Sequence, residues 1–200
     1  MKFFFQIQKN LLQLISSQFS RHIAILATGT SIAQIITIAS SPIITRIFTP
    51  ESLGLSALFV SIVGPLAIIS TMSYPIAIVL PKNQVQALKL ILLSIYLAVF
   101  FTFLFSILWF FFEQKILELF NVSDIRIYAY LAPFAIIGSA ISVVISQWLI
   151  RKKSFLLISQ IAITTAIITS GIKIIIGYFY PEPIILIFAT ILGYYVCLFF

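Results

Sequence analysis

Long apolar runs alternate with short polar connections along almost the whole chain. A helix that crosses a bilayer needs about 20 predominantly apolar residues. Runs of about this length predict transmembrane helices at about 23–45, 54–80, 88–112, 126–150, 155–179 and 184–200. The pattern therefore predicts an all-α, polytopic membrane helix bundle of about six transmembrane helices. The last run ends in apolar residues at Phe200, which indicates a chain truncated at its C-terminus.

Residues 1–21 have a different, amphipathic pattern. Bulky apolar side chains share one broad helical face, while Gln6, Lys9, Asn10 and Gln13 lie largely opposite. This arrangement is typical of a helix that lies in the membrane interface. We expect an interfacial helix at 1–21, in contact with membrane lipids.

The second apolar run contains two prolines, in the pairs Gly64-Pro65 and Tyr74-Pro75. A proline inside a membrane helix removes one backbone hydrogen bond and bends the helix axis. We therefore expect one long helix over 54–80 that is bent at both positions.

Charged residues make up only 8% of the chain against 62% hydrophobic residues, and they gather in the connections. The connections on one side carry basic residues and no acid: Lys2, Lys9, Arg21, Lys82, Lys89, Arg151, Lys152 and Lys153. The connections on the other side carry all five acids, Glu51, Glu113, Glu118, Asp124 and Glu182, with Arg46, Lys115 and Arg126. By the positive-inside rule, this asymmetry predicts a cytoplasmic N-terminus. It also explains the net charge of +7 without a nucleic-acid partner.

The first predicted span carries a stripe of polar side chains at helical spacing. Its members are Thr30, Gln34, Thr37, Ser41 and Thr45, and an angle of about 100° per residue places all five on one face. Two interpretations remain open. The stripe lines a polar cavity, or its hydroxyl groups bond to their own helix and let neighbouring helices pack closely.

Two further spans carry polar or small residues at similar spacing. In the fourth span Ala135, Gly138 or Ser139, Ser142 and Ser146 favour close helix packing. In the fifth span Thr165, Thr169 and Lys173 repeat every four residues. The Lys173 ammonium either extends to the outer interface or faces a cavity and attracts an anionic substrate.

Groups that support catalysis are missing from the predicted spans. No Asp or Glu lies within a span, and the single histidine and single cysteine, His22 and Cys197, form no plausible catalytic pair. Neither a metal-ligand cluster nor a glycine-rich phosphate loop is present in the sequence. We therefore expect no catalytic residues, no metal, no cofactor and no enzymatic activity.

The connection after the first span carries a distinctive motif. Residues 40–54 read SSPIITRIFTPESLG, and residues 77–82 at the end of the second run read AIVLPK. Together with Gly29, this segment resembles the polysaccharide and O-antigen flippases of the multidrug/oligosaccharidyl-lipid/polysaccharide exporter superfamily. The matched motif residues are Arg46, Thr49, Pro50, Glu51 and Gly54.

A local explanation for the same motif is structural. Thr49 can cap a helix that has Pro50 at its first position and Glu51 near the positive end of its dipole. We therefore expect Arg46, Pro50, Glu51 and Gly54 to serve the structure of the turn.

The resemblance implies a two-lobed exporter in a bacterial inner or plasma membrane, of which this chain is one lobe and lacks the C-terminal lobe. Such proteins translocate an oligosaccharide on an undecaprenyl-pyrophosphate-type lipid from the cytoplasmic to the outer leaflet by alternating access. On this basis Thr30, Gln34, Thr37, Ser41, Thr45 and Lys173 are candidates for the substrate path. The alternatives are a drug/cation antiporter of the same superfamily, an inactive fragment of a split flippase gene, and a membrane-embedded polysaccharide polymerase.

Overall fold

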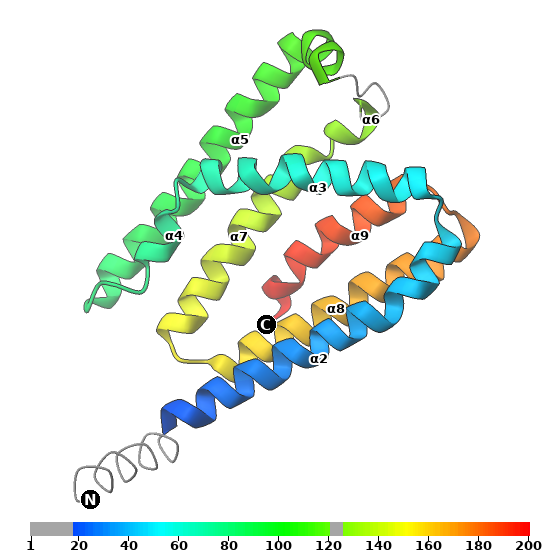
Figure 1. Cartoon of the computed structure of the whole chain (residues 1–200). Coiled ribbons are helices and arrows are strands. Elements are labelled where there is room, and N and C mark those ends of the chain that lie inside the picture. Colours follow the sequence, from blue (N-terminus) through cyan, green and yellow to red (C-terminus); the bar gives the residue numbers. More distant parts are fainter. Residues whose placement is uncertain (1–17, 121–125) are drawn as a thin grey trace, which may run out of the picture.

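The computed structural model describes residues 18–120 and 126–200, and within these ranges it contains helices and short connections but no strand. The all-α prediction is therefore confirmed (Figure 1). The predicted interfacial helix at 1–21 lies outside the described residues except for its last four, which begin the first described helix. The elements are α2 (Gln18–Ile47), α3 (Pro50–Thr71), α4 (Tyr74–Ala77), α5 (Gln84–Phe120), α6 (Arg126–Ala129), α7 (Ala132–Arg151), α8 (Phe155–Phe179), α9 (Pro183–Tyr195) and the 3₁₀ turn η2 (Val196–Phe199).

Five of the described helices are long and apolar enough to cross a membrane. They cover Ile23–Ile47, Pro50–Thr71, Gln84–Lys115, Ala132–Arg151 and Phe155–Phe179, and a shorter apolar helix follows at Pro183–Phe199. The chain is therefore a multi-pass membrane protein built as an all-α helix bundle.

The second span differs from the prediction of one helix over 54–80. Helix α3 runs through Pro65 but ends at Thr71, because Met72 and Ser73 adopt left-handed backbone conformations with φ of 47° and 57°. The chain then begins α4, which has Pro75 in its first turn. The expected bend at Pro75 is thus wrong, since the helix stops there and restarts.

Two other boundaries also differ from the prediction. The fourth span is divided into α6 and α7, and Pro133 lies in the first turn of α7, where its missing N–H group costs nothing. Helix α5 extends beyond the predicted 88–112 to Phe120. Its last turns contain Glu113, Gln114 and Lys115, which are good helix formers and do not stop a helix.

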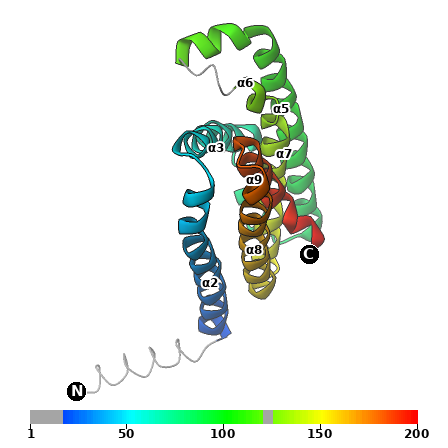
Figure 2. The ribbon, with the colours of Figure 1, turned by 90° about the vertical axis from the view of Figure 1, so that its right-hand side faces the viewer.

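The core of the bundle lies between α3, α7 and α9. It contains seven buried apolar residues, Phe59, Val63, Ala67, Ala135, Ile136, Ile187 and Ile191. A smaller cluster of Ile78, Ala87 and Val144 joins α4, α5 and α7. In Figure 2, α2 lies at one edge of the bundle and α5 at the other.

Helices α2 and α8 lie side by side and run parallel (Figure 1), and glycines bring them close together at two points. Near the start of both helices, a Cβ atom added to Gly29 would lie 2.2 Å from Ser159 Cβ, and the Ser159 hydroxyl donates to the Ile25 carbonyl at 2.9 Å. Near their ends, a Cβ added to Gly177 would lie 2.4 Å from the buried Phe48 ring. Glycine at these crossings lets the two backbones approach closely.

Arg151, the last residue of α7, forms hydrogen bonds with the turn that follows α4. The Arg151 guanidinium donates to the carbonyl groups of Ile78 at 3.1 Å and of Pro81, and also approaches that of Asn83 at 3.4 Å. The carbonyls of Ile78 and Pro81 belong to the turn after α4, whereas that of Asn83 also accepts the Ala87 N–H of α5 at 3.3 Å. Arg151 therefore satisfies backbone groups that would otherwise be costly to bury.

Candidate functional site

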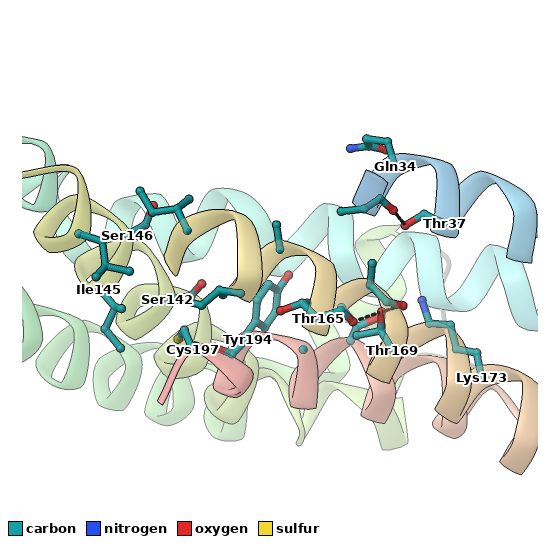
Figure 3. Close-up of a pocket in the computed structure, with 18 residues that line it drawn as sticks. Gln34, Thr37, Ser142, Ile145, Ser146, Thr165, Thr169, Lys173, Tyr194 and Cys197 are labelled. Atoms are coloured by element: carbon teal, nitrogen blue, oxygen red, sulfur yellow. Dashed lines mark hydrogen bonds between the residues drawn. The ribbon is translucent and has the colours of Figure 1, made fainter. Parts of the chain in front are cut away.

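A polar cavity of about 480 Å³ lies between α2, α7, α8 and α9. This volume falls within the range of about 300–1,000 Å³ that is usual for ligand sites. The polar residues that line it are Gln34, Thr37, Ser142, Ser146, Thr165, Thr169, Lys173, Thr190, Tyr194 and Cys197 (Figure 3).

Helix α8 contributes the longest polar row. Thr165, Thr169 and Lys173, which repeat every four residues, all line the cavity. The Thr169 hydroxyl donates to the Thr165 carbonyl at 2.8 Å, so one of the two hydroxyls is used within the helix. Gly193 of α9 makes room for this row, because a Cβ there would lie 2.7 Å from Thr169 Cγ2.

Lys173 lies at the end of this row, six residues before the end of α8, which is about 9 Å along the helix. Its side chain is half-buried and lines the cavity together with Thr169. Of its two predicted positions, the structure places Lys173 at the cavity. No described residue forms an ion pair or hydrogen bond with its ammonium group, and no carboxylate is among the residues that line the cavity.

Helices α7 and α9 contribute residues that the sequence had not assigned to a site. Ser142 and Ser146 were attributed to helix packing, yet both line the cavity, whereas Ala135 and Gly138 of the same helix are buried as expected. Helix α9 adds Thr190 and Tyr194, and the 3₁₀ turn η2 adds Cys197. Their spacing, with Gly193, is that of one helix face and was the signal available in the sequence.

The polar stripe of α2 divides between the two interpretations. Gln34 and Thr37 line the cavity, whereas Thr30, Ser41 and Thr45 do not. The hydroxyls of Thr30, Thr37 and Thr45 donate to carbonyls of α2 itself, at 2.9, 3.0 and 3.1 Å. The Gln34 side-chain amide forms no hydrogen bond with any described residue, so it is available to bond a ligand in the cavity.

The motif residues do not line the cavity: Thr49, Pro50, Glu51 and Gly54 belong to the start of α3 and Arg46 to the end of α2. Thr49 is the N-cap residue, its hydroxyl accepts the Ser52 N–H at 3.2 Å, and Pro50 and Glu51 occupy the first turn. Arg46 is exposed at the end of α2. A Cβ on Gly54 would meet no atom within 4 Å, so nothing in the described structure requires glycine there.

The cavity offers hydroxyl groups, one carboxamide and one ammonium group. Such a lining can bond a neutral, hydroxyl-rich molecule and attract an anion. No group of three or more His, Cys, Asp or Glu side chains suited to a metal occurs in the described part of the chain. The lining is suited to binding a molecule of that kind.

Comparison of the chain with protein-family models, with curated proteins and with solved structures finds no match. A functional interpretation therefore depends on the motif of residues 40–54 and on the geometry of the cavity.

Proposed function

We propose that the chain is part of a flippase that moves a lipid-linked oligosaccharide across a bacterial inner or plasma membrane. The carrier lipid is of the undecaprenyl-pyrophosphate type, and the transport mechanism is alternating access. The proposal rests on the resemblance of residues 40–54 and 77–82 to the polysaccharide flippases and on the cavity described above.

The observation that carries the proposal is the combination of Lys173 with uncharged polar groups in one intramembrane cavity. A charge within a membrane is costly and calls for a partner. The pyrophosphate of the carrier supplies that partner, while Gln34, Thr165 and Tyr194 offer hydrogen bonds to the sugars. A drug/cation antiporter fits less well, because a carried or coupling cation calls for a carboxylate that the cavity lining does not provide.

The transport cycle requires an orientation and a second lobe. We place the N-terminus and the basic connections in the cytoplasm, following the positive-inside rule, so that the row from Thr165 to Lys173 leads outward. A second, C-terminal lobe completes the enclosure of the substrate in this scheme.

Deletion of the gene in its own host is expected to stop delivery of the polysaccharide to the cell surface. Restoring the wild-type gene should restore delivery, and Gln34→Ala should reduce it by about two- to tenfold, the effect of losing one or two hydrogen bonds. The measurement is surface polysaccharide together with lipid-linked oligosaccharide retained in the inner leaflet.

Gln86→Ala is the matched control, because Gln86 is exposed at the start of α5 and away from the cavity. Normal surface polysaccharide in the deletion strain would contradict the proposed function. Normal surface polysaccharide in the Gln34→Ala strain would show that Gln34 does not bind the substrate, and it would leave the proposed function standing.

A further inference from the structure

A second cavity, of about 260 Å³, lies on the other side of the core between α3, α5, α6 and α7. Its lining is almost entirely apolar, with side chains such as Phe59, Leu66, Phe105 and Ile136. It shares no lining residue with the polar cavity. Its chemistry therefore suits a hydrocarbon chain and not a sugar.

Two hydrogen-bond donors in this lining have no partner in the described structure. They are the Thr102 hydroxyl and the Trp109 indole N–H, both shielded from solvent. Thr102 is 3% exposed and, unlike Thr169 and Thr190, does not bond to its own helix. A buried donor without an acceptor costs about 1–3 kcal/mol, so an occupant with an acceptor would recover part of that energy.

The cavity opens sideways, toward the surface that faces lipid. Three of its lining residues are largely exposed, namely Ile62 at 41%, Phe110 at 72% and Tyr130 at 53%. Large exposed apolar side chains on a membrane-spanning helix are the normal lipid-contacting surface. A lipid chain can therefore enter from the bilayer without crossing water.

The outer rim of the cavity carries a polar cluster. The Tyr130 hydroxyl donates to Glu113 Oε2 at 3.2 Å, and Arg126 Nε donates to Glu113 Oε1 at 2.8 Å. The Arg126 guanidinium is cationic, as arginine always is at physiological pH, and hydrogen bonding to Glu113 raises its pKa further. The Arg126 side chain is 58% exposed, which leaves its other N–H groups free for a phosphate.

From its place near the end of the apolar part of α5, we infer that Trp109 lies near the level of the phospholipid ester groups. It is six residues, or about 9 Å, before Lys115, where the apolar part of α5 ends. Tryptophan is enriched at this level of membranes because its ring is apolar and its N–H is polar. Thr102 lies seven residues deeper, about 10 Å further into the hydrocarbon.

We propose that this cavity is a binding site for a membrane glycerophospholipid, which inserts one acyl chain between α3, α5 and α7. The ester carbonyl of that chain accepts the Trp109 N–H, and the phosphate contacts Arg126. The acyl chain passes Thr102 without bonding to its hydroxyl, since hydrocarbon offers no acceptor.

The test uses the full chain, purified in dodecyl maltoside, with Trp148→Phe so that Trp109 is the only one of the two tryptophans left. Phosphatidylcholine with brominated acyl chains is titrated in, because bromine quenches a nearby indole. We expect quenching that saturates at about one lipid per chain. Unbrominated phosphatidylcholine should compete fully, and its dialkyl ether analogue about fivefold less well, because it lacks the carbonyl that accepts one hydrogen bond.

Two variants locate the site. Ser106→Phe fills the cavity and should abolish saturable quenching, whereas Leu108→Phe, at an exposed position of the same helix, should leave it intact. The Thr102→Val variant should bind the brominated phosphatidylcholine as tightly as the protein with Thr102 does. The comparison of ester and ether lipids is made on the unfilled cavity, so it does not depend on the folding of Ser106→Phe.

Three results would overturn the proposal. The first is quenching that rises in proportion to lipid and does not saturate. The second is stronger competition by a polyprenyl phosphate than by phosphatidylcholine, which would assign the cavity to an isoprenoid chain. The third is loss of binding in Thr102→Val, which would place the acceptor deeper than an ester group.

Discussion

Replacement of Lys173 by alanine is expected to reduce export of the lipid-linked oligosaccharide by at least about tenfold. Lys173 is the cation among the residues that line the polar cavity, and no described residue pairs with it. Removing one partner of a desolvated charge pair costs about 2–5 kcal/mol, and a tenfold change corresponds to about 1.4 kcal/mol. The measurement is surface polysaccharide in the deletion strain that carries each variant.

Two further variants separate charge from other effects. Lys173→Arg keeps the charge and should retain most of the export. Lys89→Ala removes a lysine that is exposed at the basic end of α5 and should leave export unchanged. Equal export by Lys173→Ala and the wild type would show that Lys173 does not meet the substrate.

Replacement of Gly29 by alanine is expected to destabilise the pair of helices α2 and α8. The new Cβ would lie 2.2 Å from Ser159 Cβ and 3.0 Å from Ser159 Cα, so the backbones must move apart. Overpacking of this kind costs about 1–3 kcal/mol. The measurement is the thermal unfolding midpoint of the purified protein, which should fall.

Gly171→Ala is the matched control on α8, since a Cβ there meets no atom within 4 Å. Alanine is the better helix former, so this variant should be at least as stable as the wild type. The double variant Gly29→Ala/Ser159→Gly moves one Cβ from α8 to α2 and should recover part of the loss. An unchanged midpoint for Gly29→Ala would mean that the two helices do not approach closely at this point.

Five of the six predicted transmembrane helices were predictable because length and apolar content set them locally, whereas the sixth predicted span, 184–200, is a shorter apolar helix. The cap at Thr49 was predictable for the same reason. The break after Thr71 was not, because neither Met72 nor Ser73 has a preference for the left-handed conformation that it adopts. Proline at position 75 indicated a disturbance there but not whether the helix would bend or stop.

The candidate site was predictable only along single helices. The spacing of Thr165, Thr169 and Lys173 places them on one face, and in the structure all three line one cavity. Which helices face that row depends on packing, so Ser142, Ser146 and Tyr194 were missed.

Packing also explains why only the middle of the α2 stripe lines the cavity. Close contacts of α2 with α8 at Gly29 and at Phe48 bracket Gln34 and Thr37. Thr30 lies beside the first contact, and Thr45 lies near the second. The periodicity of one helix holds no information about where a neighbouring helix approaches it.

The most direct measurement of substrate passage is photo-crosslinking inside the polar cavity. A photo-reactive amino acid at Thr165 lies in the cavity, and the same group at Ile175 lies on an exposed part of α8, where Ile175 is 66% exposed. After irradiation of living cells, the adducts are identified by mass spectrometry. We predict an oligosaccharide-bearing polyprenyl lipid attached at Thr165 and ordinary phospholipid at Ile175. Absence of the saccharide lipid at Thr165, or equal amounts at both positions, would contradict a polar cavity that carries the substrate.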